Sequence, residues 1–173
     1  MANYAGEMFS AYRLRKCKNA DFLQLPGWFA SKDEVFEWTG NNIAYPIDPE
    51  HLIKKLSAEH LFSFCLIEST TKQMVAFGQT MLSGNRVHLA RLCVHPEHRN
   101  RGLGAKLVVK LATYSANYFG VKVASLFVYP DNKPAYHLYQ KLGFRQTKYY
   151  APLPNPKSCY MEVALLTLQK ASE

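Results

Sequence analysis

The segment at residues 94–105 contains the residue types that bind phosphate groups. It follows a strand-like run, carries Arg99 and Arg101, and places Gly102 and Gly104 at the start of a long helical pattern. The first amides of a helix have no partner within the helix and carry the positive end of its dipole, so they can donate hydrogen bonds to a pyrophosphate. The glycines would let the backbone approach the phosphate oxygens, and the arginines would add charge. The alternative is an ordinary strand-to-helix loop with solvated arginines.

Two common phosphate-binding motifs do not fit this segment. No Gly-Lys-Ser/Thr follows, as a Walker A loop requires, and Leu107 stands where a dinucleotide-binding G-x-G-x-x-G motif needs its third glycine. A second motif is therefore needed to identify the loop.

That second motif lies at residues 128–144, which read VYPDNKPAYHLYQKLGF. Together the two segments resemble the GNAT superfamily of N-acetyltransferases. The loop matches the family pattern R/Q-x-x-G-x-G/A at Arg99, Gly102 and Gly104. The later segment matches N-x-x-A-x-x-x-Y-x-K-x-G-F at Asn132, Ala135, Tyr139, Lys141, Gly143 and Phe144.

The resemblance implies acetyl-CoA as the acyl donor. The backbone of Leu92, Cys93 and Val94 would bind the pantetheine arm like an added strand, in a gap between the strands expected at 86–94 and 121–129. Asn132 would bond the pantetheine or its neighbour. The loop residues implied to hold the pyrophosphate are Arg99, Asn100, Arg101, Gly102, Leu103, Gly104 and Ala105.

Transfer by direct attack of an amine requires a neutral nucleophile, a donor for the developing oxyanion and a proton for the departing sulfur. The resemblance implies that Tyr139 is the general acid, and a phenol with a pKa of about 10 is reasonably matched to a thiol near about 8.5. The alternative is that Tyr139 only packs on the last helix. A backbone amide near Leu92 or Val94 would serve the oxyanion.

The general base is less clear from the sequence. Many family members place a glutamate on the strand before the phosphate loop, but residues 86–94 contain no acidic residue. His88 shares a strand face with Ala90 unless a bulge intervenes, so it is the first candidate, with Glu68 and Asp48 as weaker ones. The alternative is that His88 is a half-buried strand residue satisfied by a hydrogen bond.

The acceptor amine is expected to bind within the first 60 residues. Trp28, Trp38 and Tyr45 lie there beside a run of acidic residues, and aromatic rings with carboxylates suit an ammonium group. The same acids would equally serve as helix caps and the aromatics as core.

The elements that position these residues predict an α/β (α+β) fold, with one GNAT-like domain over residues 1–173 and an acetyl-CoA binding core at 86–144. Apolar periodicity predicts a mixed, mostly antiparallel sheet of about seven strands flanked by helices, with one parallel βαβ crossover. The strands are expected at 10–16, 61–68, 73–82, 86–94, 121–129, 144–150 and 158–168. The helices are expected at 20–25, 31–40, 48–58, 102–119 and 132–142.

Composition limits the classes of protein to which the chain could belong. The chain of 173 residues carries a net charge of +8, all of it arising after residue 86, which a bound phosphorylated cofactor explains as well as DNA does. We expect no nucleic acid partner, because no reader motif is present. The four cysteines are far apart and are expected to be core thiols of a cytoplasmic protein, without a disulfide or a metal. No run is apolar enough for a membrane span, so no membrane partner is expected.

The leading hypothesis is an acetyl-CoA-dependent N-acetyltransferase that acts on a primary amine of a small molecule or peptide. The alternative is a coenzyme A-binding sensor or interaction module without efficient catalysis, suggested by the missing glutamate. A homodimer is a further possibility, because the strand at 158–168 could pair across two subunits.

Overall fold

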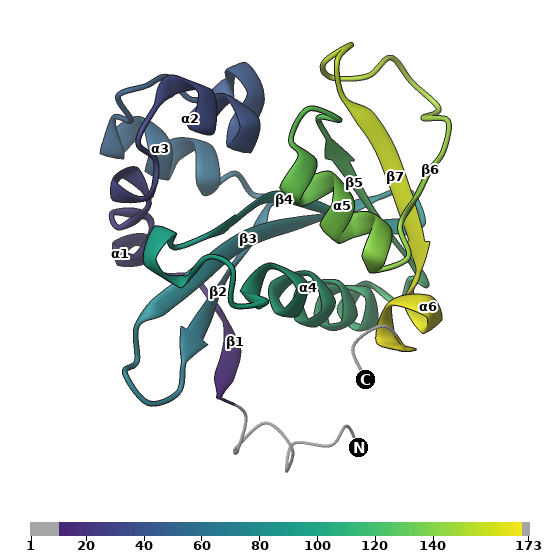
Figure 1. The fold of residues 1–173 in the computed structure, drawn as a ribbon, viewed down its shortest axis with the longest axis horizontal. Coiled ribbons are helices and arrows are strands. Elements are labelled where there is room, and N and C mark those ends of the chain that lie inside the picture. The colour runs from purple at the N-terminus through teal and green to yellow at the C-terminus, as the bar shows by residue number, and fades with distance from the viewer. Residues whose placement is uncertain (1–10, 171–173) are drawn as a thin grey trace.

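A computed structural model describes residues 11–170, which form a seven-stranded sheet with helices on both faces (Figure 1). The strand order is β1-β2-β3-β4-β5-β7-β6, and only β4 and β5 are parallel neighbours. The strands are β1 (Tyr12–Lys16), β2 (Phe62–Glu68), β3 (Met74–Ser83), β4 (Arg86–Val94), β5 (Val123–Val128), β6 (Arg145–Gln146) and β7 (Cys159–Ala164). The helices are α1 (Asn19–Phe22), α2 (Lys32–Thr39), α3 (Pro49–Leu56), α4 (Leu103–Phe119), α5 (Lys133–Lys141) and α6 (Leu165–Lys170). The expected fold class is confirmed.

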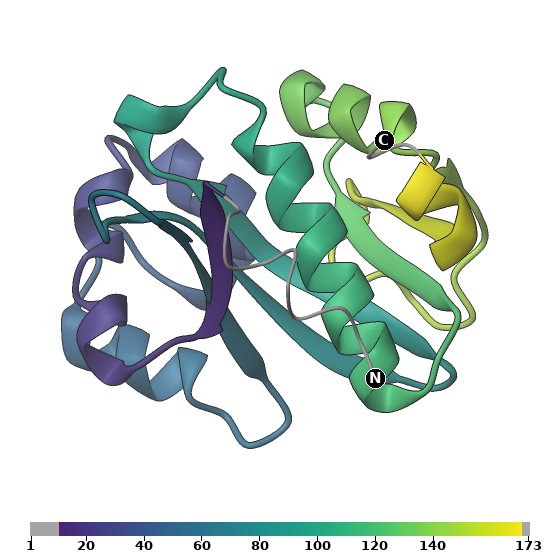
Figure 2. The same ribbon diagram turned by 90° about the horizontal axis from the view of Figure 1, so that it is seen from below.

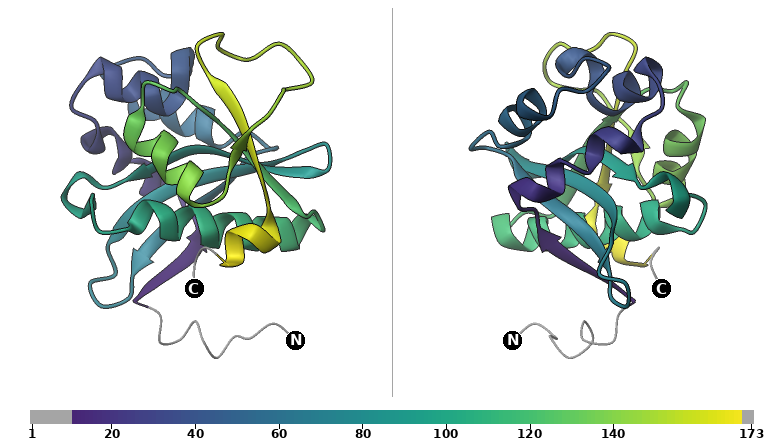
Figure 3. Two further views of the ribbon diagram at one scale, coloured as in Figure 1. Left: turned by 45° about the vertical axis from the view of Figure 1, so that its right-hand side comes forward. Right: turned by 90° about the vertical axis from the view of Figure 1, so that its left-hand side faces the viewer.

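Strand alternation divides the core between the two faces of the sheet. Cys65 and Phe77 pack with the aliphatic and aromatic residues of α1, α2 and α3 on one face. Their chain neighbours Leu66 and Ala76 point the other way and pack against α4. Helix α4 accordingly crosses the face opposite to α1–α3 (Figures 2 and 3). No helix among residues 11–170 is long and apolar enough to cross a membrane.

Three helices begin at side-chain caps. The Ser31 hydroxyl oxygen accepts a hydrogen bond from the amide of Glu34 (3.2 Å), and the Asp48 carboxylate accepts one from the amide of His51 (2.7 Å). Asn132 caps α5, because its Oδ1 accepts a bond from the amide of Ala135 (3.2 Å). Such caps satisfy amides that have no partner within the helix.

The crossover β4–α4–β5 is present as expected, and the two strands pair only at their beginnings. Val87, His88 and Leu89 lie opposite Ala124, Ser125 and Leu126, and no pairing follows beyond that point. The two strands therefore diverge over their second halves, which places a gap inside the sheet.

The C-terminal segment differs from the expectation in its strands and in an additional helix. The strand expected at 144–150 is paired only at Arg145–Gln146, and the strand expected at 158–168 ends at Ala164. Helix α6 follows, because Leu165 and Leu168, three residues apart, are buried against α4 and its neighbours while Leu166 is exposed. Strand β7 also lies between β5 and β6, so it is not the free edge that pairing across a dimer would need.

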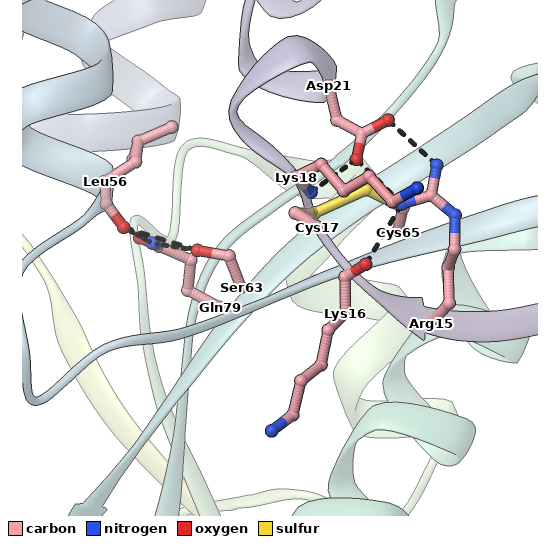
Figure 4. The surroundings of a disulfide bond; sticks show 9 residues. All are labelled: Arg15, Lys16, Cys17, Lys18, Asp21, Leu56, Ser63, Cys65 and Gln79. Carbon is pink, nitrogen blue, oxygen red and sulfur yellow. Dashed lines mark hydrogen bonds and ion pairs between the residues drawn. A yellow bond between two sulfur atoms is a disulfide. The ribbon is translucent and has the colours of Figure 1, made fainter.

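The expectation of four free thiols is wrong. Cys17, the residue after β1, forms a disulfide with Cys65 of β2, with a Cα–Cα distance of 5.6 Å (Figure 4). Cys93 and Cys159 are free. The pairing depends on the β1–β2 register, which places Arg15 opposite Cys65. The spacing of the cysteines in the sequence does not reveal this register.

Candidate active site between the diverging strands

The gap between β4 and β5 contains a cavity of about 560 Å³. Its walls include Leu89 and Leu92 from β4, Leu126 and Val128 from β5, and Tyr139 from α5. Residues of α2 and the following turn, Glu37 to Asn42, close its other side. A cavity of this size suits a drug-sized ligand or a ligand segment. Its lining includes residues from both faces of the sheet: Leu89 and Tyr139 pack in the core on the α4 face, and Trp38 packs in the core on the α2 face.

Tyr139 reaches this cavity from α5. Its side chain is buried, and burial raises its pKa above the ordinary value of a phenol. The hydroxyl group makes no hydrogen bond to any residue from 11 to 170, and the ring contacts Phe144. A protonated phenol on a cavity wall can donate a proton to a group bound there.

A β-bulge shapes the β4 wall of the cavity. Gln79 lies opposite Ala90 and Phe77 lies opposite Cys93, so β4 carries one residue more than β3 in this interval. Arg91 has a φ of +50° at this point, and its carbonyl oxygen accepts a hydrogen bond from the Trp38 indole (2.8 Å).

Beyond the bulge, Leu92 packs on the α4 face of the sheet. A Cβ atom at Gly78 would lie 2.7 Å from a Leu92 methyl group and 2.8 Å from one of Leu111, so only glycine fits between them. Leu92 thus lines the part of the cavity nearest α4, while Cys93 packs with Phe77 on the other face.

His88 lines the cavity from a deeply buried position. Its Nδ1 lies 3.0 Å from the Ser125 hydroxyl oxygen, and its ring lies among Phe127 and Tyr160. Burial lowers the pKa of His88 to about 4. The ring is therefore neutral at pH 7, and its protonated form is strongly disfavoured.

Glu37 lies at the cavity rim on α2, and the sequence did not single it out as a site residue. Its carboxylate accepts a hydrogen bond from the Asn132 amide group (3.1 Å), which joins α2 to the start of α5. Burial, then the charges of Glu34 and Asp33, raise the pKa of Glu37 above its ordinary value. The sequence shows Glu34 and Asp33 three and four residues before Glu37 on α2, but the position of Glu37 across from Asn132 depends on the fold.

The loop before α4 has a backbone suited to anion binding. Asn100 and Gly102 both have positive φ values, +61° and +73°, just before the first amides of α4. Residues in the left-handed conformation just before a helix direct successive N–H groups toward one side. These N–H groups form a concave site for anions. The residues fit a pyrophosphate, and Asn100, Arg101 and Gly102 are exposed where it would bind.

Two residues of the same motif have other contacts. A Cβ at Gly104 would lie 3.1 Å from a Leu138 methyl group, so Gly104 allows α5 to pack closely on α4. The Arg99 guanidinium is directed toward the N-terminal helices, where it donates to the Trp28 carbonyl oxygen (3.2 Å) and lies 3.7 Å from Glu34.

The predicted acceptor residues are separated in the structure. Trp38 lines the cavity, but Trp28 is buried against His95 away from it, and Tyr45 is exposed with its hydroxyl group bonded to the Ala30 carbonyl oxygen. Of the alternative bases, Asp48 caps α3 and Glu68 bonds Thr71 at the far end of β2. Neither lines the cavity.

A separate group of possible metal ligands lies near β1. The Cys17 and Cys65 sulfurs and an Asp21 oxygen lie within 4.8 Å of one another. The sulfurs are joined to each other, and the Asp21 carboxylate is bound by Arg15, which lowers the pKa of Asp21 (Figure 4). These ligand atoms therefore already have partners.

Comparison with known proteins gives the same assignment as the motifs. The model of the acetyltransferase (GNAT) family matches residues 27–144. A spermidine N-acetyltransferase from Vibrio cholerae, solved with CoA and spermine, is similar with a TM-score of 0.71 and 16% identity over 92% of this chain and 98% of that one.

Two further solved structures share the fold. An uncharacterized protein from Bacillus halodurans has a TM-score of 0.74 and 15% identity over 92% of this chain and 87% of its own. The ribosomal-protein-S5-alanine acetyltransferase from Vibrio fischeri has a TM-score of 0.65 and 13% identity over 90% of this chain and 94% of its own. At these identities the likeness concerns the fold.

Proposed function

The chain belongs to the acetyltransferase (GNAT) family of acetyl-CoA-dependent N-acetyltransferases, and we propose that it acetylates a primary amine by direct attack inside the cavity between β4 and β5. The observation that carries the proposal is this cavity, because residues from both faces of the sheet line it, Tyr139 and Glu37 among them.

Acetyl-CoA would enter from the α4 face. The backbone of Leu92, Cys93 and Val94, free of β5, would pair with the pantetheine arm, and the loop at 99–105 would hold the pyrophosphate through its amides. Asn132 caps α5 and bonds Glu37, so it would act mainly by holding these two elements together.

The amine would enter from the α2 face. Its nitrogen forms the new bond to the acetyl carbon while the carbon–sulfur bond breaks and its electron pair passes to sulfur. Tyr139 donates its phenolic proton to that sulfur, and a backbone amide near Leu92 at the bulge stabilises the charge that develops on the carbonyl oxygen. Solvent then returns the proton to Tyr139.

Glu37 is a better candidate than His88 for the base that takes the proton from the amine. The buried imidazole of His88 has a pKa of about 4 and binds a proton weakly at neutral pH. The carboxylate of Glu37 lies at the open rim, and its raised pKa brings it closer to that of an amine. His88 would instead shape the neutral, aromatic wall of the acceptor side.

A polyamine such as the one bound by the Vibrio cholerae neighbour is not favoured as the acceptor. A polyamine carries several positive charges, whereas Glu37 is the single acidic residue among the described residues that line the cavity. The experiment that tests the proposal is calorimetric titration with acetyl-CoA, followed by a thiol-release assay with a panel of amines. Amine-dependent release of CoA supports it; binding without release from any amine favours a coenzyme A sensor.

A further inference from the structure

Arg91 is an unusual residue to find on the wall of an amine-binding cavity. It lines the cavity on the acceptor side, where a cationic ammonium group would be repelled. It is also a non-glycine residue with a φ of +50°, an unfavourable conformation that persists only where the surroundings impose it.

The bulge directs the Arg91 side chain to the face of the sheet that α1–α3 cover. Its Nη1 donates a hydrogen bond to the Gln79 side-chain oxygen (2.7 Å), and Gln79 is on the face covered by α1–α3. In regular alternation, residue 91 would instead point toward α4. The extra residue in β4 therefore brings a guanidinium group into the acceptor side of the cavity.

Gln79 is itself held in one orientation. Its Nε2 donates to the Leu56 carbonyl oxygen (2.9 Å) and lies 2.7 Å from the Ser63 hydroxyl oxygen, so its Oε1 must face Arg91 (Figure 4 shows the Gln79, Leu56 and Ser63 contacts). The Trp38 indole donates a hydrogen bond to the Arg91 carbonyl oxygen. Side chain and backbone of Arg91 are thus both fixed before any ligand binds.

The guanidinium group has no acidic partner. No ion pair joins Arg91 to an aspartate or glutamate within residues 11–170, and Gln79 is the side chain that accepts a hydrogen bond from it there. Arg91 is half-buried, and burial lowers its pKa. A guanidinium offers five N–H donors in a planar fork that matches a carboxylate. The donors that Gln79 leaves free would therefore bind an anion that the ligand brings.

The cavity combines this cation with one anion. Glu37 and Arg91 are the charged side chains among its described lining residues, because His88 is neutral at pH 7. One carboxylate and one guanidinium in the same cavity complement a molecule with one ammonium and one carboxylate.

We infer that the acceptor is an amino-carboxylate, such as an amino acid, whose carboxylate is bound by Arg91 while its amine is directed to Glu37 and the acetyl group. The inference rests on the proposed function and names the substrate class for it. A diamine has no carboxylate, and a peptide N-terminus has none on the carbon that carries the amine, so either acceptor would leave Arg91 without an anionic partner.

The test compares matched acceptors that differ only in the carboxylate. Glycine, serine, methionine and phenylalanine are each offered as the free acid and as the amide, together with 1,4-diaminobutane, to the wild type and to Arg91→Gln and Arg91→Lys. The measured quantity is the ratio of kcat/KM for the acid to kcat/KM for its amide. Because the ratio is compared between variants, intrinsic differences in amine reactivity cancel.

We expect the wild type to prefer at least one free acid and Arg91→Gln to reduce that preference by about 10- to 100-fold, through a higher KM for the acid with little change for the amide. Arg91→Lys should retain part of the preference for the acid, because lysine keeps the positive charge but lacks the planar set of N–H donors. Arg13→Gln, an exposed arginine on β1, makes the same change in net charge and should leave the ratio unchanged.

Two results would overturn the inference: a wild type that prefers amides or the diamine, or a preference for acids that Arg91→Gln leaves intact. If no amine is acetylated, the proposed function fails, and binding of the acids and amides in the presence of CoA, measured by calorimetry, still decides the role of Arg91. Tighter binding of acids that is lost in Arg91→Gln supports the carboxylate site; equal binding of both forms contradicts it.

Discussion

The Trp38 indole donates a hydrogen bond of 2.8 Å to the carbonyl oxygen of Arg91, and so joins helix α2 to the bulge of strand β4. This contact spans the acceptor side of the cavity. It fixes the position of α2, which carries Glu37, relative to the strand that lines the proposed acetyl site.

Trp38→Phe should therefore affect both stability and acceptor binding. It keeps an aromatic ring but leaves the Arg91 carbonyl oxygen without its donor, so we expect a loss of about 1–2 kcal/mol in the free energy of unfolding. We also expect KM for the amine to rise several-fold while acetyl-CoA affinity is retained. Denaturant unfolding and steady-state kinetics measure the two effects.

Trp28→Phe is the matched control for Trp38→Phe. Trp28 is 3% exposed and Trp38 is 8% exposed, but Trp28 does not line the cavity. The control should lose stability without a change in KM for the amine. Equal KM values in the two variants would show that the Trp38 contact does not position the acceptor site.

Gly102→Ala should weaken acetyl-CoA binding. Gly102 has a φ of +73° and no atom within 4 Å of the position of a Cβ, so alanine would strain the backbone without a clash. Relief of that strain would turn the loop amides away from the pyrophosphate. Calorimetric titration should show an affinity lower by about tenfold or more.

Gly84→Ala provides the control, because Gly84 has a φ of +58° and equally open surroundings in the β3–β4 turn. Both substitutions should cost a similar amount of stability, about 1 kcal/mol. Equal acetyl-CoA affinity in the two variants would contradict the assignment of the loop.

The sequence alone names most residues of the proposed donor site and fewer residues of the proposed acceptor site. The loop at 99–105 and Tyr139 belong to contiguous motifs, so their types and spacing were readable. Glu37 and Arg91 come together only through the bulge in β4 and the packing of α2 on the sheet. A bulge depends on the register of two strands, which composition and alternation do not specify.

The pH dependence of catalysis should report Glu37. Its pKa is raised by burial and by Glu34 and Asp33, and the base must be ionised, so kcat/KM should fall as the pH drops through this raised value. Asp33→Asn removes one cause of the shift and should move the acid limb to lower pH. Glu37→Gln should lower kcat/KM by about 10²- to 10⁴-fold.

An acid limb that stays in place in Asp33→Asn, and that disappears in His88→Gln but not in Glu37→Gln, would assign the base to His88 instead. Both profiles are measured at saturating acetyl-CoA, so that effects on donor binding do not enter.

His88 should make folding stability depend on pH. Its pKa is about 4 in the folded protein and 6.5 in a model peptide, so the unfolded chain takes up the proton first as the pH falls. The stability that His88 provides is therefore complete above pH 6.5 and is lost between pH 6.5 and 4, by up to about 3 kcal/mol.

Denaturant unfolding across this pH range checks the prediction. His88→Gln should remove that part of the slope, whatever its effect on stability at pH 7. His137→Gln, at an exposed histidine of α5, should retain it. A slope that is the same in wild type and His88→Gln would show that His88 is not buried as a neutral group.

The most direct test of transfer in this cavity is Tyr139→Phe, with Tyr136→Phe on the same helix as control because Tyr136 does not line the cavity. Acetyl-CoA affinity and amine-dependent CoA release are measured on the same preparations. We expect acetyl-CoA to bind Tyr139→Phe within a few-fold of wild type while kcat falls by about 10²- to 10⁴-fold, and Tyr136→Phe to behave as wild type. A kcat for Tyr139→Phe equal to that of the wild type would contradict proton donation by Tyr139 to the departing thiolate.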